Sequence, residues 1–347
     1  MKAAIFKGKG KIAVEERPKP TVKEKTDAVV RVVLACVCGS DLWFYRGISE
    51  HQEGPIGHEF IGVVDEIGAD VKNIKKGDFV IAPFAFSDGT CPNCQAGFQT
   101  ACQHGGFFGM GTEGDGGQAE YVRVPQADGT LVPVPGSDFS EETLASLLTL
   151  SDVMGTGYHA AVSAGVKEGD TVAVVGDGAV GLSAVLSAKL LGAKRIVIMS
   201  RHEERQKLAL DWGATDIIEE RGDEAIKAVM DLTNGIGVDA VMECVGSREA
   251  NETAFALARA GSIVGRVGVP HDVEINAQVT FYRNVGMRGG PAPARAYLPE
   301  LLKSVLAGDI NPGKVFDFVT DLDHIAEAYA AMDERRAIKS LVKVSEL

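Results

Sequence analysis

The part of the chain after residue 170 alternates short apolar runs with helical patterns, and this alternation constrains the fold more than any other feature. The apolar runs, which are predicted strands, cover residues 171–175, 195–199, 216–218, 238–243 and 262–267. The predicted helices between them cover residues 180–191, 202–211, 223–232 and 248–257. Strands that alternate with helices form parallel sheets, so the sequence predicts an α/β domain with a doubly wound parallel sheet.

A glycine-rich loop lies between the first strand and the first helix of this series. Its residues are Gly176, Asp177, Gly178, Ala179, Val180 and Gly181. In this setting the first glycine allows a tight turn, the second lets the backbone approach a pyrophosphate, and the third lets helix and strand pack closely. The helix N-terminus then faces the anion. The loop therefore predicts a dinucleotide site, with a plain glycine turn as the alternative.

The end of the second strand bears on the choice between NAD and NADP. An acid about 20 residues beyond the loop would bind the free 2′-hydroxyl of NAD, but Ser200 and Arg201 stand there instead. Arg201 can pair with a 2′-phosphate and Ser200 can donate a hydrogen bond. Each such bond to a charged group is worth about 1.5–3 kcal/mol, or roughly 10- to 150-fold. We therefore expect NADP(H), with NAD(H) as the alternative and a solvated surface role as the other interpretation of Arg201.

The first part of the chain has a different pattern, which predicts a second domain. Short β-rich runs with turn glycines at residues 28–34, 61–67, 78–82 and 120–124 predict a barrel or sandwich. The tail has helical patterns near 296–306 and 325–332 and a closing strand at 340–344, which we expect to return to the first domain. The predicted division is residues 1–152 with 288–347 in one domain and 153–287 in the other.

Charge and hydropathy exclude several classes of partner. The formal net charge of −13 argues against binding to nucleic acid or anionic membranes. No apolar run is long enough to span a bilayer. The sequence from Met1 to Phe6 resembles a strand and not a signal peptide. We therefore expect a cytoplasmic protein whose cysteines stay reduced.

Three side chains far apart in the sequence are candidate metal ligands: Cys38, His58 and Asp152. A thiolate, an imidazole and a carboxylate can hold Zn²⁺ with a fourth position open, as in catalytic sites. Asp41 could accept a hydrogen bond from a ligand imidazole, and Glu59 could be a displaceable fourth ligand. Spacing alone does not bring these residues together, so unrelated roles are the alternative.

The chain has six cysteines, and three of them form a cluster. Cys91, Cys94 and Cys102 lie within twelve residues of one another. Without a secretion signal, such spacing favours a metal site over disulfides. Cys36 and Cys244 lie in apolar runs and are expected in the core.

These motifs resemble those of the medium-chain zinc-dependent alcohol dehydrogenases, over the whole chain. The matching segments are residues 38–41, 57–64, 77–80, 119–121 and 176–181. The resemblance implies a GroES-like β-barrel catalytic domain and a Rossmann domain, with the active site in the cleft between them. It also implies a small-molecule alcohol or carbonyl substrate, and we expect a homodimer or homotetramer.

The resemblance assigns roles to individual residues. Cys38, His58 and Asp152 match the family's catalytic zinc ligands. Many members have cysteine where this chain has Asp152. The NADP-dependent secondary alcohol dehydrogenases resemble this chain both at Asp152 and at the pair Ser200 and Arg201. Zinc would act as a Lewis acid on the substrate oxygen, and Ser40 would take the hydroxyl proton. Many relatives have a relay histidine where this chain has Trp43; His51 could serve instead or be a loop residue.

The cysteine cluster matches the family's structural-zinc lobe at its last three positions. The first position, usually cysteine, is Asp88 here. Carboxylates ligate zinc at about the imidazole distance, so Asp88 could complete the site with Cys91, Cys94 and Cys102. His104 could replace Asp88, or the lobe could lack metal.

Two other functions share these motifs. One is a polyol or threonine dehydrogenase that uses NAD(H). The other is a non-catalytic dinucleotide-binding protein, which would have no need of Ser40 together with the three candidate ligands.

Overall fold

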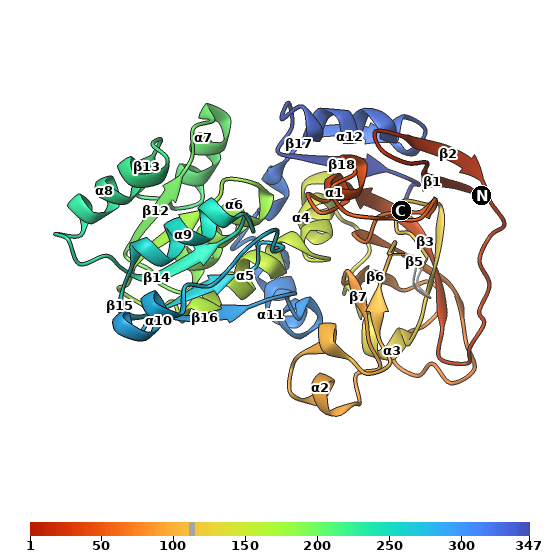
Figure 1. Cartoon of the computed structure of the whole chain (residues 1–347). Coiled ribbons are helices and arrows are strands. Elements are labelled where there is room, and N and C mark those ends of the chain that lie inside the picture. The colour runs from red at the N-terminus through yellow and green to blue at the C-terminus, as the bar shows by residue number, and fades with distance from the viewer. Residues whose placement is uncertain (111–114) are drawn as a thin grey trace. The chain divides into compact units, whose positions relative to one another are not determined.

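The computed structural model describes residues 1–110 and 115–347 and contains two compact units (Figure 1). The first unit combines Met1–Asp152 with Pro293–Leu347, and the second is Val153–Ala292. The second unit is therefore continuous in sequence, whereas the first is built from both ends of the described chain.

The second unit contains the predicted parallel sheet. Its six strands, in spatial order, are β13 (Asp216–Ile218), β12 (Arg195–Met199), β11 (Thr171–Val175), β14 (Val238–Glu243), β15 (Ala258–Arg266) and β16 (Gly286–Gly289). All neighbours pair in parallel, which confirms the doubly wound α/β prediction. This spatial order is that of dinucleotide-binding folds. From β11 the chain adds strands outward to β13, and it then returns to the other side of β11 and adds strands outward from β14 to β16.

Helices α5 to α10 belong to the same unit. They are α5 (Val153–Ala164), α6 (Ala179–Leu190), α7 (Glu203–Asp211), α8 (Gly222–Leu232), α9 (Arg248–Leu257) and α10 (Ala277–Arg283). The sequence pattern predicts neither α10 nor β16, and the strand predicted at residues 262–267 begins four residues after the observed start of β15. Because β16 pairs with β15, residues 288–292 belong to the second unit, and the later boundary lies at Pro293 instead of the expected residue 288.

The first unit is built mainly from antiparallel strands. Its largest sheet contains, in spatial order, β10 (Val132–Pro133), β6 (Phe79–Ala82), β5 (Phe60–Ile67), β3 (Ala28–Cys36), β18 (Lys339–Lys343) and β17 (Phe316–Asp321), with β9 (Tyr121–Val124) also paired to β3. The smaller sheets are β2 (Ile12–Glu16), β1 (Lys2–Phe6) and β4 (Gly54–Pro55), and β7 (Ala85–Phe86) with β8 (Gly106–Phe107). The closing strand β18 pairs antiparallel with β3, which places Leu341 opposite Cys36.

The helices of the first unit are mostly short. They are α1 (Asp41–Tyr45), α2 (Pro92–Gln95), α3 (Ala127–Thr130), α4 (Glu141–Thr149), α11 (Ala294–Ala307) and α12 (Ile325–Asp333), with 3₁₀ turns η1 (Gln99–Ala101), η2 (Pro312–Val315) and η3 (Leu322–His324). The hydroxyl of Ser140 caps α4 by accepting from the Thr143 amide. Across the described ranges, no helix is both long and apolar enough to cross a membrane.

The core of the first unit fixes the segments on either side of Cys38 and His58. Most apolar side chains of β3 and β5, including Val30 and Phe60, are buried, and the phenol of Tyr329 from α12 is buried with them. The residues that follow β3 and those that precede β5 are therefore anchored to a packed sheet and are not part of a free loop.

Candidate functional site

The three candidate ligands of the first metal site converge within the first unit. Cys38 follows β3, His58 precedes β5, and Asp152 follows α4. The Oδ2 atom of Asp152 lies 3.7 Å from Cys38 Sγ and 3.3 Å from His58 Nε2. With Glu59, the donor atoms lie within 4.8 Å of one another. The fold thus brings together residues up to 114 positions apart.

Asp41 orients two of these ligands. One carboxylate oxygen lies 3.3 Å from His58 Nδ1, on the opposite side of the ring from Asp152. The other accepts hydrogen bonds from the Cys38 amide at 3.0 Å and from Gln118 Nε2 at 3.2 Å. Gln118 is itself fixed by the Tyr329 hydroxyl, which donates to its Oε1 at 2.8 Å. Such outer partners set the tautomer and direction of a metal-binding imidazole.

The electrostatics of this cluster suit a divalent cation. Burial lowers the pKa of His58, but the neighbouring Asp41 and Cys38 outweigh burial and raise it well above its usual value. Burial and the nearby Glu59 raise the pKa of the Cys38 thiol. Several groups that ionise to anions are thus crowded around one point. A bound Zn²⁺ would stabilise their charged forms, and the sulfur, nitrogen and oxygen donors are those that zinc prefers.

Glu59 is completely buried beside these ligands and is paired with a lysine that the sequence analysis did not single out. Lys339 Nζ lies 2.7 Å from Glu59 Oε1 and also donates to the Val37 carbonyl at 3.1 Å. Glu59 Oε2 has no hydrogen-bond partner in the described part of the chain. Glu59 therefore retains one oxygen that a metal could engage, while Lys339 offsets its charge. Lys339 directly precedes the predicted closing strand, and nothing in that local pattern marks it as buried.

The candidate proton acceptor Ser40 immediately precedes α1. Its side chain is half-buried, and its hydroxyl does not cap the helix. His51, the possible relay residue, is differently placed: its Nε2 lies 2.7 Å from the Gly109 carbonyl oxygen. Its ring packs against Phe6 and Phe44, at centroid distances of 5.2 and 4.8 Å. These contacts make His51 part of a packed loop.

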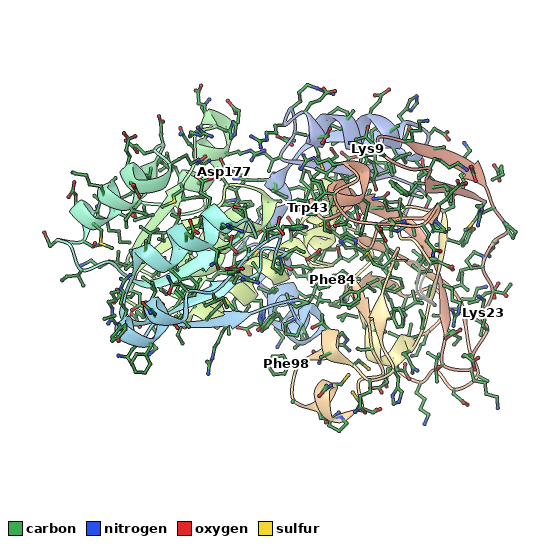
Figure 2. All side chains as sticks on the ribbon, in the orientation of Figure 1. Lys9, Lys23, Trp43, Phe84, Phe98 and Asp177 are labelled. Atoms are coloured by element: carbon green, nitrogen blue, oxygen red, sulfur yellow. The ribbon has the colours of Figure 1, made fainter. Side chains whose placement is uncertain are left out.

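Aromatic rings lie beside the candidate metal ligands. The ring of Phe84 meets His58 edge-on at 6.2 Å and stacks on Phe107 at 5.9 Å. Phe84 and Trp43, the second residue after Asp41, are labelled in Figure 2. His58 thus has an aromatic ring on one side, and that ring belongs to a stacked pair.

The four residues of the second candidate site also lie together. The donor atoms of Asp88, Cys91, Cys94 and Cys102 are within 4.8 Å of one another. Cys91 and Cys102 have their sulfur atoms 3.8 Å apart, much farther than a disulfide bond allows. His104 is not in this donor group; its Nδ1 lies 2.6 Å from Asp88 Oδ2. The geometry therefore favours Asp88 over His104 as the fourth donor.

Ionisation within this cluster also fits a metal site. Burial raises the pKa of Asp88, but hydrogen bonds from the Cys91 amide and from His104 hold it well below its usual range. Hydrogen bonds from the backbone of Gln103 and Cys94 lower the pKa of the Cys91 thiol to about 7. Burial raises that of Cys94 to about 12. A carboxylate and a readily formed thiolate are thus present to start metal binding.

The glycine loop of the second unit has the shape that a pyrophosphate needs. Gly176 has a φ of +112°, and a Cβ on Gly181 would lie only 2.0 Å from the Gly176 carbonyl oxygen. A Cβ on Gly178 would meet nothing within 4 Å, so the space above that residue is open. Helix α6 starts at the next residue without a side-chain cap. Its first amides are therefore available to an anion.

The end of β12 differs from the expectation for Ser200. This side chain is completely buried, and its hydroxyl donates to Asp177 Oδ2 at 2.8 Å. Its single proton is therefore already used and is not a free donor for a 2′-phosphate. Arg201 is exposed. Asp177 also pairs with Arg205 Nη1 of α7 at 3.1 Å. The local sequence does not reveal this contact, because it joins the glycine loop to a helix beyond the next strand.

Known proteins resemble the chain over both units. The alcohol dehydrogenase GroES-like domain family matches residues 24–136, and the zinc-binding dehydrogenase family matches residues 179–307. Zinc-type alcohol dehydrogenase B of Aspergillus flavus is 36% identical over 100% of this chain and 82% of its own. Glutathione-independent formaldehyde dehydrogenase of Bacillus subtilis is 31% identical over 98% of this chain and 96% of its own. The structure of alcohol dehydrogenase TADH from Thermus sp. ATN1 superimposes with a TM-score of 0.91 at 32% identity, and the superposition covers 99% of this chain and 100% of that one.

Proposed function

Because this chain belongs to the medium-chain zinc-dependent alcohol dehydrogenase family, we propose that it transfers hydride between NADP(H) and an alcohol or its carbonyl form. The observation that carries this proposal is the convergence of Cys38, His58 and Asp152 next to the segment that bears Ser40. The test is a screen of alcohols, polyols, aldehydes and ketones with both cofactors, before and after removal of metal by a chelator. Turnover that survives complete removal of zinc would contradict the proposal.

Each residue of the first site has a distinct proposed role. Cys38, His58 and Asp152 would hold zinc, which when bound supplies Lewis acidity toward the substrate oxygen. Asp41 would hold the imidazole proton on His58 Nδ1, which leaves the lone pair of Nε2 free to bind the metal. Glu59 offers its unpaired Oε2 as a displaceable donor.

Ser40 is proposed to accept the hydroxyl proton when an alcohol is oxidised and to return it when a carbonyl is reduced. It is the candidate nearest in sequence to Cys38, and its hydroxyl does not cap the helix that follows. Trp43 cannot carry the proton onward, and His51 is held by the Gly109 carbonyl and two aromatic rings. We therefore propose that water, and not a second side chain, exchanges protons with Ser40.

An apolar substrate fits the surroundings of His58 better than a polyol does. Phe84 and Phe107 form a stacked pair on one side of the imidazole. Aromatic surface of this kind gains free energy by burying carbon, whereas a hydroxyl placed against it would lose hydrogen bonds to water. The same screen tests this preference, because simple alcohols should then exceed polyols in kcat/KM.

We propose that Asp88, Cys91, Cys94 and Cys102 hold a second, structural zinc. Cys94→Ser is expected to remove about one zinc per chain and to lower the melting temperature, because a structural site contributes folding free energy directly. Cys244→Ser is the matched control, since Cys244 lies in the other unit, outside both donor groups. Metal analysis and thermal unfolding provide the measurements. An unmodified protein that binds one zinc per chain would contradict the second site.

The preference for NADP(H) is proposed to depend on Arg201, whose guanidinium is always charged and matches phosphate with two donors. Arg201→Ile should lower kcat/KM with NADP(H) by roughly 10- to 150-fold and leave kcat/KM with NAD(H) nearly unchanged. Arg221→Ile, another exposed arginine in the same unit, is the matched control. Equal losses with both cofactors would show that Arg201 does not recognise the 2′-phosphate.

We propose a homodimer or homotetramer, and a cytoplasmic location stays a prediction from the sequence. Strand β16 forms an edge of the parallel sheet, and on the preceding helix Phe281 and Tyr282 are 76% and 78% exposed. An unpaired edge near exposed aromatic side chains is typical of an interface. Light scattering should give at least twice the chain mass, and the double change Phe281→Ser with Tyr282→Ser should reduce it. A monomer at micromolar concentration would contradict this assembly.

A further inference from the structure

The sequence has no acidic residue at the end of β12, but the fold brings one to that position from the glycine loop. Asp177, the second residue of the glycine loop, places Oδ2 2.8 Å from the hydroxyl of Ser200, the first residue after β12. Ser200 occupies the position about 20 residues beyond the loop at which dinucleotide-binding folds recognise the adenosine ribose. Figure 2 labels Asp177, which contacts α7 through Arg205.

The carboxylate of Asp177 is held in place and keeps spare acceptor capacity. The residue is only 8% exposed. Ser200 donates to one oxygen and Arg205 Nη1 lies 3.1 Å from the other. A carboxylate offers about four acceptor positions, so two contacts leave room for a further donor. Because Ser200 is completely buried and has one proton, the hydroxyl fixes the carboxylate instead of competing for a ligand.

We infer that Asp177 is the specificity-determining residue for the 2′ position of the adenosine ribose, an inference that rests on the proposed dinucleotide site. Its carboxylate accepts a hydrogen bond from the 2′-hydroxyl of NAD(H) and repels the 2′-phosphate of NADP(H). Arg205 partly neutralises this repulsion, and the exposed Arg201 attracts the phosphate. Cofactor choice is therefore a balance of opposed charges, and the protein binds both cofactors with a smaller NADP(H) preference than Arg201 alone would give.

The test is direct binding of NADH and NADPH to the zinc-loaded protein, by calorimetry, without turnover. Asp177→Asn removes the charge but keeps the size of the side chain. It should weaken NADH and strengthen NADPH, so that the ratio of their dissociation constants shifts toward NADPH by about tenfold or more, the effect of one hydrogen bond to a charged group. A shift below threefold, or an equal change for both cofactors, would overturn the inference.

Two further variants separate this effect from general changes of charge or folding. Glu203→Gln removes an exposed acid from α7, where Glu203 pairs with Lys207, and should leave the ratio unchanged. An equal shift in this variant would overturn the inference. Ser200→Ala removes the hydrogen bond that fixes the Asp177 carboxylate and keeps its charge, so it should weaken NADH binding without strengthening NADPH binding. A Ser200→Ala variant that strengthens NADPH binding as much as Asp177→Asn does would show that the charge of Asp177 does not discriminate between the cofactors, and would overturn the inference.

The binding data also separate this inference from the proposed role of Arg201. If Asp177→Asn shifts the ratio while Arg201→Ile leaves NADPH binding intact, the assignment of Arg201 is wrong and that of Asp177 stands. If Arg201→Ile weakens NADPH alone while Asp177→Asn changes nothing, the inference about Asp177 is overturned and the proposed cofactor preference stands.

Discussion

Replacing Asp152 with alanine is expected to abolish turnover and to remove about one zinc ion per chain, because a site with too few donors no longer holds metal. In the structure Asp152 contacts both other candidate ligands, Cys38 and His58. Loss of an outer partner of a metal ligand typically costs 10- to 100-fold in metal affinity or activity. Loss of a ligand itself should therefore cost more than about 100-fold. Elemental analysis and steady-state kinetics on the same preparation provide the measurement.

Two variants make the result specific to the ligand. Asp138→Ala removes an exposed carboxylate of the same unit and should change neither zinc content nor rate. Asp152→Cys replaces one zinc donor by another and should retain metal. Full activity of Asp152→Ala with both zinc ions still bound would show that Asp152 is not a ligand.

The second large effect is expected from Ser40→Ala, which should lower kcat by roughly 10²- to 10⁴-fold, the usual contribution of a positioned acid–base group. Zinc content should not change, because zinc in proteins is held by cysteine, histidine and carboxylate side chains and not by a serine hydroxyl. The measurements are kcat for alcohol oxidation and for carbonyl reduction, which share the same proton transfer in opposite directions. Both should fall by the same order of magnitude.

Ser40→Thr keeps a hydroxyl and should preserve most of the rate. Ser49→Ala is the matched control, because this serine lies beyond the end of α1, on the other side of that helix in the sequence from Ser40. A loss below threefold for Ser40→Ala would mean that water accepts the proton directly and that Ser40 has no catalytic role.

The parallel sheet was predictable because its central strands are buried on both faces. Such strands are continuous runs of β-branched and other apolar residues, as in Thr171–Val175. The edge strand Gly286–Gly289 has two glycines and one arginine among its four residues. Glycine has a low strand propensity, so only the backbone pairing with β15 identifies this strand.

The candidate ligands were predictable by residue type and motif, but their partners were not. Lys339 and Glu59 are 280 positions apart, and Gln118 is 77 positions from Asp41. Their contacts depend on where β18 and the residues before β9 lie in the folded unit, which local sequence does not specify. The same reason explains Ser200: its position at the end of β12 was clear, but not that Asp177 would take its only proton.

The position of β18 between β3 and β17 also sets an order for biosynthesis. Domains generally fold as units while the ribosome extends the chain, and Val153–Ala292 is continuous, so this unit can fold before translation ends. The unit that contains Cys38, His58 and Asp152 still lacks a strand of its main sheet until Lys339–Lys343 emerges. Before that, the end of β3 at residues 34–36 lacks its pairing with β18, and Glu59 lacks its buried cation. A chain truncated before Lys339 would therefore contain the whole parallel-sheet unit but would lack part of the sheet that positions the candidate metal ligands.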